Sequence, residues 1–186
     1  MQELFDELVA EIRRTNPITA PALRPGLAPD VVREKLASLP FQISPDAVAL
    51  YSWADGSNGK FEMLPGAYFC SLDEALLHFN IRYSAKDQLQ GIFFEPHFDS
   101  FRFLEDFSDG GYSFGRIDSP SEGQIVSLEI HAPWTIAFRD LAALLRTSIE
   151  CYRQGLLCPD LDTADFVRYY ELAGRMNPDM EAWKNP

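Results

Sequence analysis

Cysteine is scarce in this sequence, and its spacing forms no metal or redox motif. The chain of 186 residues has three cysteines, Cys70, Cys151 and Cys158, with no CxxC or CxxxC spacing. A sparse, odd set of thiols is typical of a protein in a reducing compartment and excludes a disulfide framework. We therefore expect buried or incidental thiols.

Long apolar runs are also lacking. A membrane-spanning helix needs about 20 apolar residues, and no run in this sequence approaches that length. The first residues, MQELFDELVAEIRR, carry acids where a secretory signal would carry Lys or Arg before an unbroken apolar stretch. The sequence therefore predicts a cytoplasmic protein without a targeting segment or a membrane partner.

Basic residues are few. The 16 Lys and Arg stand against 28 Asp and Glu, which gives a formal net charge of -12. Such a chain is repelled by nucleic-acid backbones and anionic lipid, and it is attracted to basic partners. Residues 95–122 carry two arginines and seven acids: Glu95, Asp99, Glu105, Asp106, Asp109, Asp118 and Glu122. Two interpretations stay open, a charge that keeps the protein soluble and an acidic face for a basic protein.

Recognisable catalytic and ligand-binding motifs are missing as well. The glycine-rich run 55–59 has Gly56 too close to Gly59-Lys60 for a Walker loop, and it lacks the alternating oxygen ligands of a calcium loop. It is predicted to be a turn that joins a helix to a strand. His78, His97 and His131 have no second ligand at metal spacing, and His97 with Asp99 is a weak proton-shuttle pattern. We predict no catalytic residue, metal site or cofactor, and expect no small-molecule ligand.

The hydrophobic periodicity predicts an α+β domain. Helices are expected at 3–14, 29–38, 44–53, 71–79, 137–154 and 163–175, with a capping box at Ser71-Leu72-Asp73-Glu74. The buried face of the last helix is assigned to Phe166, Ala173 and Tyr169 or Tyr170. A strand is expected at 60–64, and about four more between Gly91 and Ile130. In the strand that contains Phe101 and Phe103, both rings are expected to point inward and Arg102 outward.

These elements form a single domain with an antiparallel or mixed central sheet of about five to six strands. Residues 1–28 are predicted to be an N-terminal helix with a proline-rich connector, and residues 29–186 the α+β domain itself.

The order of motifs over residues 30–155 resembles the SUKH superfamily, which includes the fungal Smi/Knr cell-wall-assembly regulators and many bacterial immunity proteins. Leu39-Pro40 and a helix ending in aromatic residues lead to Asn58-Gly59, and a strand then precedes the Ser71-Leu72-Asp73-Glu74-Ala75 helix. The aromatic run Phe93-Phe94-Glu95-Pro96 and Gly123-Gln124-Ile125-Val126 follow, before the helix that contains Phe138. The chain has Phe where the family often has Trp, and no acid directly after the 109–111 turn.

The resemblance implies a binding protein rather than an enzyme. Family members of bacterial type bind and neutralise toxin domains, many of them nucleases, whose phosphate-binding clefts are basic. The seven acids of residues 95–122 are therefore predicted to share one rim and to contact a basic toxin domain. Two alternatives are a regulatory scaffold of the same fold and a hydrolase that uses paired carboxylates.

Overall fold

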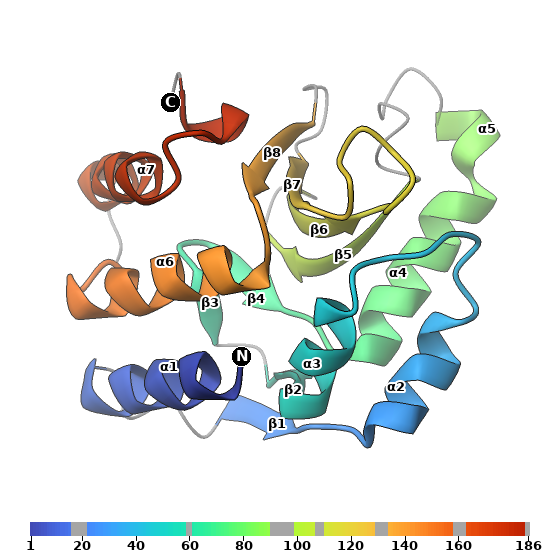
Figure 1. Cartoon of the computed structure of the whole chain (residues 1–186), viewed down its shortest axis with the longest axis horizontal. Helices are drawn as coiled ribbons and strands as arrows, with labels where there is room; N and C mark the ends of the chain where they lie inside the picture. Colours follow the sequence, from blue (N-terminus) through green and yellow to red (C-terminus); the bar gives the residue numbers. More distant parts are fainter. Residues whose placement is uncertain are drawn as a thin grey trace.

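The computed structural model describes residues 1–15, 22–58, 61–89, 99–106, 110–128, 134–157 and 163–184. The helices are α1 (Gln2–Thr15), α2 (Pro29–Leu36), α3 (Asp46–Trp53), α4 (Leu72–Ser84), α5 (Lys86–Leu89), α6 (Leu141–Arg153), α7 (Thr163–Met176) and the 3-10 turn η3 (Glu181–Trp183). The strands are β1 (Leu23–Pro25), β2 (Ala54–Ser57), β3 (Glu62–Leu64), β4 (Ala67–Phe69), β5 (Ser100–Glu105), β6 (Gly111–Gly115), β7 (Ile125–Leu128) and β8 (Thr135–Phe138). Figure 1 shows this order along the chain.

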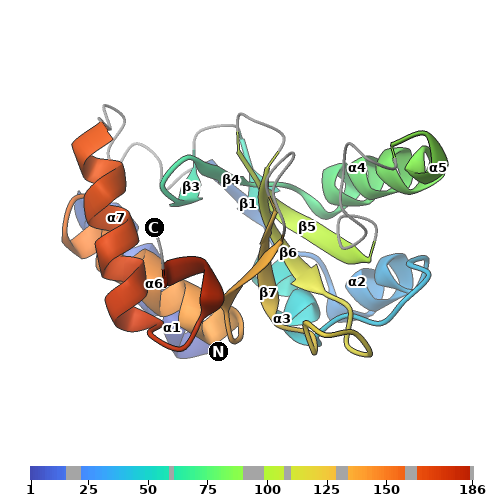
Figure 2. The ribbon, with the colours of Figure 1, turned by 90° about the horizontal axis from the view of Figure 1, so that it is seen from above.

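The six strands β3 to β8 form one antiparallel sheet in sequence order, and β1 pairs with β2 in a separate two-stranded sheet. Figure 2 shows the large sheet nearly edge-on, with α1, α6 and α7 on one side and α2, α4 and α5 on the other. Helices on both faces of one curled sheet confirm the predicted α+β class and the predicted number of strands.

The helix boundaries follow from local signals in the sequence. The Ser71 hydroxyl accepts from the Glu74 amide at 3.3 Å while a Glu74 carboxylate oxygen accepts from the Ser71 amide at 2.9 Å, so the predicted capping box is present. Asp140 caps α6 by accepting from the Ala143 amide at 2.7 Å. The expected helix at 137–154 was therefore too long, because residues Thr135–Phe138 form β8 instead.

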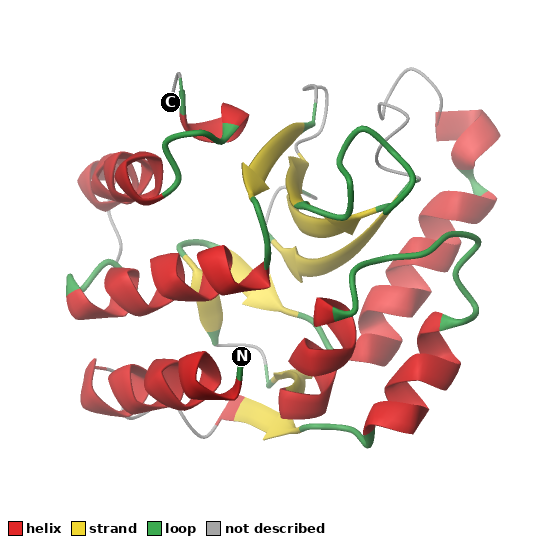
Figure 3. Ribbon diagram, in the orientation of Figure 1, coloured by secondary structure: helices red, strands yellow, loops and turns green. Residues whose placement is uncertain are grey.

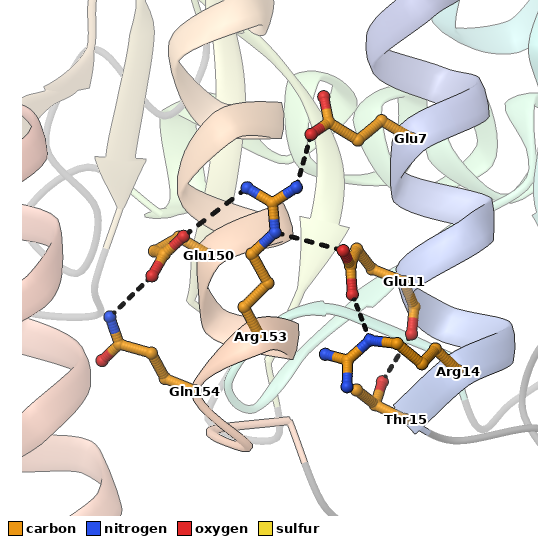
Figure 4. A network of polar contacts seen from close by, with 7 residues as sticks. All are labelled: Glu7, Glu11, Arg14, Thr15, Glu150, Arg153 and Gln154. Carbon is orange, nitrogen blue, oxygen red and sulfur yellow. Dashed lines mark hydrogen bonds and ion pairs between the residues drawn. The ribbon is translucent and has the colours of Figure 1, made fainter.

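Helix α1 is part of the common core. Phe5, Leu8 and Ile12 lie on one face of α1 and are at most 2 % exposed. Above this apolar contact, the Arg153 guanidinium of α6 donates to Glu7 at 2.6 Å and to Glu11 at 3.1 Å (Figure 4). Helix α1 is thereby held against α6 by apolar burial and by two exposed ion pairs.

The glycine-rich run after α3 has a structural role. Its first part is strand β2, which pairs with β1 (Figure 3). Strand β1 lies in the segment that was predicted to be a proline-rich connector. Gly56 has a φ of +76°, and a Cβ added there would lie 2.3 Å from the Ser71 nitrogen. The neighbouring Asp55 carboxylate accepts from the Leu72 amide at 2.8 Å. The expected simple turn is therefore a strand that packs against the start of α4; Gly59 and Lys60 lie outside the described residues.

Strand β5 differs from the expected alternation of its side chains. Phe101 and Phe103 are both fully buried, as predicted, but Arg102 is only 3 % exposed rather than outward-facing. The register between β5 and β6 shifts between Arg102 and Leu104, which is typical of a β-bulge. The shift comes after Arg102, so it does not explain this burial; helices cover both faces of the sheet (Figure 2), and Arg102 is therefore buried as well as its neighbours Phe101 and Phe103. The expected strand at 91–96 lies outside the described residues.

Candidate functional site

The predicted acidic rim is divided between two places. Glu95 and Asp109 lie outside the described residues. Glu105 ends β5 and Asp106 follows it, whereas Asp99 precedes the start of the same strand. Because Ser100 pairs with Gly115, the loop after β6 with Asp118 and Glu122 lies at the Asp99 end. At about 3.3 Å per residue, the six residues of β5 separate the two groups by about 17–20 Å.

The acids at the Asp99 end are paired with a cation. The Arg116 guanidinium donates to Asp118 at 2.7 Å and lies 3.7 Å from the Asp99 carboxylate. The hydrogen bond from Arg116 lowers the pKa of Asp118, which therefore stays ionised. Glu122 lies in the following turn with a φ of +47° and is exposed. Asp99 and Asp118 share the single positive charge of Arg116, so the charge of this end is compensated only in part.

Glu105 also has cationic neighbours, which come from α4. Its carboxylate lies 2.6 Å from the His78 Nδ1 and 3.8 Å from the Arg82 guanidinium. Burial, followed by the charges of Glu105 and Glu74, raises the pKa of the nearby Cys70 thiol to about 12. A thiol with a raised pKa stays protonated and is a poor nucleophile. The cluster therefore does not supply an activated cysteine.

Asp106 borders a cavity of about 370 Å³ between the sheet and the C-terminal elements. The β3–β4 turn and strands β6, β7 and β8 form one wall, while α7 and η3 form the other. Figure 1 shows the 181–183 turn between α7 and β8. Five of the lining residues are aromatic: Tyr112, Phe166, Tyr169, Tyr170 and Trp183.

The polar groups of Tyr112, Tyr169 and Trp183 are hydrogen-bonded within the protein. The hydroxyl groups of Tyr112 and Tyr169 lie 2.9 Å apart, and the Trp183 indole donates to the Ala137 carbonyl at 2.6 Å. The Trp183 ring centroid lies 5.8 Å from that of Tyr169 and 6.1 Å from that of Tyr170. These contacts fix the rings in place, so the cavity has rigid aromatic walls.

The cavity disfavours additional negative charge. Burial is the main cause that raises the pKa of Tyr112, and the charge of Asp106 adds to this rise. The hydrogen bond with Tyr169 acts in the opposite direction and lowers the pKa of Tyr112. Burial also raises the pKa of Tyr169, with a further contribution from Tyr112. Both phenols therefore remain neutral at physiological pH, and Asp106 supplies the negative charge of the site.

The Asp106 side chain is positioned by the turn that follows β5. One carboxylate oxygen accepts from the Gly110 amide at 2.9 Å, and a Cβ added at Gly110 would lie 2.5 Å from the other oxygen. Sequence reasoning counted Asp106 among the acids but missed the aromatic residues around it.

The aromatic residues of α7 were predicted to be a core face, and the structure separates them. Tyr169 is 2 % exposed, whereas Phe166 and Tyr170 are 36 % and 39 % exposed. The spacing of Phe166, Tyr169 and Tyr170 indicated in the sequence that these rings lie together, since residues three and four apart share one side of a helix. It did not reveal that Tyr169 is buried in the core while Phe166 and Tyr170 are exposed beside a cavity.

Two other hollows exist among the described residues. A groove of about 480 Å³ runs between α2 and α3 and is lined mainly by apolar side chains such as Leu36, Phe41 and Val48. A smaller one of about 120 Å³ lies between the start of α6 and the end of α7, with Arg139 and Arg146 beside it. Neither hollow contains a predicted site residue.

No protein-family model matches the chain, and no curated protein matches its sequence. The resemblance to the SUKH superfamily therefore stays a prediction from short motifs. Within the described ranges, no group of three or more His, Cys, Asp or Glu side chains is arranged to hold a metal ion. No helix in the described part of the chain combines the length and apolar character needed to cross a membrane.

Proposed function

We propose that this chain is a non-enzymatic binding protein for a basic protein domain, of the immunity-protein type that the motif resemblance implies. The observation that carries the proposal is the net charge of -12. A protein with this charge attracts a cationic partner and accelerates their encounter, because opposite charges steer diffusion. A nuclease toxin fits this chemistry, since its phosphate-binding cleft must be basic.

The arrangement of the described acids favours one end of the sheet as the contact. At one end Asp99 and Asp118 share Arg116, and at the other end Asp106 lies beside a cavity that is lined by five aromatic residues. Interface energy usually comes from a few well-packed aromatic or charged residues rather than from charge alone. We therefore assign the main contact to the Asp106 end and not to a single continuous rim.

Co-purification tests this proposal. The tagged full chain is isolated from its own cells at low salt, washed with increasing NaCl, and the eluted proteins are identified by mass spectrometry. We expect a basic domain that leaves the column as salt rises, because the Debye length falls from about 10 Å at 0.1 M to about 3 Å at 1 M. The purified chain should also inhibit that partner's nuclease activity at equimolar concentration.

The control is a double variant, Asp99→Asn with Asp118→Asn, which removes two negative charges from the Asp99 end. It should retain the partner nearly as well as the wild type. A partner that is acidic, or one held equally at 1 M NaCl, contradicts the electrostatic proposal. A basic partner that binds without losing its activity favours the regulatory scaffold instead.

A further inference from the structure

We infer that an exposed apolar strip on α7 anchors the basic partner by receiving one of its apolar side chains beside the cavity between α7 and the sheet. The strip consists of Phe166, Val167 and Tyr170, and we call it the α7 strip. The inference rests on the proposed function and deepens it, because the net charge attracts the partner and the α7 strip supplies the short-range contact.

The α7 strip is exposed although the same helix buries other apolar side chains. Phe166, Val167 and Tyr170 are 36 %, 53 % and 39 % exposed, whereas Tyr169 and Leu172 are at most 3 % exposed. Phe166 and Val167 lie four and three positions before Tyr170, so the three side chains are neighbours on the helix surface. An exposed apolar patch of this kind marks an interaction surface more often than a single exposed apolar residue does.

The cavity beside the strip has an apolar side and a polar side. Phe166 and Tyr170 belong both to the strip and to the lining, together with Trp183. The polar side chains of the lining, Asp106, Ser127 and Thr135, come from the sheet side instead. An apolar side chain of the partner is therefore expected to contact the rings on the α7 side of the cavity.

The rings of the strip are held in place before any partner binds. A Cβ added at Gly66 would lie 3.6 Å from the Phe166 ring, so this ring rests on the turn between β3 and β4. The Tyr170 ring centroid lies 5.5 Å from that of Tyr169 and 6.1 Å from that of Trp183. Because rings that are already ordered lose little conformational entropy on binding, they are suited to anchor a partner.

A second exposed apolar pair lies on α4 and lacks such a cavity. Leu77 and Ile81 are 56 % and 59 % exposed, but they line none of the three hollows described above. The strongest contacts of protein interfaces are well-packed pockets from which water is excluded. The α7 strip borders a cavity and the α4 pair does not, so we assign the contact to α7.

The charge of the chain decides which occupant fits the strip. Two copies with a net charge of -12 repel each other, and so does one copy and an anionic membrane, whereas a basic protein is attracted. Residues 163–184 themselves carry four acids and three bases: Asp165, Glu171, Asp179, Glu181, Arg168, Arg175 and Lys184. The charge around the strip is therefore almost balanced, as is typical of the centre of an interface, where charged residues are depleted. The excess of acids that attracts the partner lies elsewhere on the chain.

A titration with small probes tests the strip without the partner. N-acetyl-leucine amide carries an apolar side chain, and N-acetyl-asparagine amide is a polar probe of similar shape. We expect the leucine probe to shift the NMR amide resonances of Gly66, Val167 and Tyr170. The asparagine probe should bind about tenfold more weakly, because it gains nothing from leaving water. Equal binding of the two probes contradicts the inference.

Two matched variants locate the effect. Val167→Asp places a charge within the α7 strip, and Leu77→Asp makes the same change on α4, on the other side of the sheet (Figure 2). Both positions are more than half exposed, so both variants should fold, which circular dichroism checks. Val167→Asp should weaken the leucine probe about fivefold or more, and Leu77→Asp should leave its affinity within about twofold. If Val167→Asp binds the leucine probe like the wild type, the inference is wrong.

Partner capture separates this inference from the proposed function. Val167→Asp makes the chain more acidic, so a purely electrostatic contact predicts that a basic partner is retained as well as before or better. The α7 strip predicts the opposite, a loss of about tenfold in affinity, while Leu77→Asp retains the partner. If both variants retain the partner equally, the strip is not the contact, although the proposed function remains.

Two further outcomes overturn the assignment of the strip to a basic partner. If the leucine probe binds but the wild type captures no basic protein, the proposed function fails and this assignment fails with it. If the wild type self-associates in analytical ultracentrifugation and Val167→Asp does not, a second copy of the chain is the occupant instead.

Discussion

Truncation of Phe5 is the sharpest test of the architecture, because it asks whether α1 is an integral part of the core. The Phe5 side chain is 2 % exposed, and its ring stacks on Trp53 of α3 with centroids 4.6 Å apart and planes 5° from parallel. Phe5→Ala removes this ring and leaves a cavity where α1 contacts the rest of the protein.

The expected loss can be estimated from the buried area. A buried aromatic side chain removes about 150–250 Å² from water, which at about 25 cal/mol per Å² corresponds to about 4–6 kcal/mol. The alanine methyl keeps part of this area buried, while the cavity left behind adds to the cost. We therefore expect Phe5→Ala to lower the free energy of unfolding by about 3–5 kcal/mol. That is a large share of the about 5–15 kcal/mol typical of a domain.

This change in stability is measured by urea denaturation, with far-UV circular dichroism and tryptophan fluorescence as the two probes. The control is Arg13→Ala on the exposed side of the same helix, which should shift stability by no more than about 0.5 kcal/mol. The two probes should report the same midpoint, because α1 unfolds with the rest of the core. A Phe5→Ala variant within about 0.5 kcal/mol of the wild type would refute the docked position of α1.

Three further predictions concern turns and charges. Gly56→Ala should lower the free energy of unfolding by at least about 1–3 kcal/mol, because it adds a steric clash to a positive φ. Gly155 also has a positive φ, of +70°, but no atom lies within 4 Å of an added Cβ, so Gly155→Ala should lower it by only about 1–2 kcal/mol. Urea denaturation measures both changes. The hydrogen bond from Ser71 is the main cause that lowers the pKa of Glu74 below 4.5. Its stabilisation is therefore complete above the unfolded pKa and is lost as pH falls through the folded pKa. The gap in urea midpoint between wild type and Glu74→Gln should narrow from pH 7 to pH 3; a constant gap contradicts this. Arg153→Ala should destabilise the protein at low salt. The difference in stability from the wild type should shrink at 1 M NaCl, since salt screens the ion pairs of Arg153 with Glu7 and Glu11 at the surface. A difference that salt does not change would mean that the ion pairs do not hold α1.

Much of the fold was predictable because its signals are local. The amphipathic period of α1 and the capping box at Ser71 depend on residues within one or two turns of helix, so they are readable without the partner elements. The short strands β1, β2, β4 and β8 were missed, because three or four residues carry too little periodicity to identify a strand. The bulge between Arg102 and Leu104 was also missed, since it depends on how β5 pairs with β6.

The candidate site was predictable in composition but not in position. The excess of acids between residues 95 and 122 was evident, and Asp106 was among them. Its aromatic neighbours Phe166, Tyr170 and Trp183 come from the last part of the chain, beyond the motif resemblance. No local pattern links residue 106 to residue 183. The prediction of a single rim did not take account of the antiparallel pairing of β5 and β6. This pairing places the two groups of acids at opposite ends of the strands.

The sequence by itself determined the charge, the α+β class and the starts of helices such as α4, because these follow from composition, from short-range periodicity and from caps that satisfy backbone groups nearby. The tertiary structure alone decided which acids pair with Arg116 and which acid borders a cavity. Those properties depend on contacts between residues that are distant in sequence, such as Arg116 with Asp99 and α7 with the sheet. Burial and pairing, which set how a charge behaves, exist only once the chain has packed.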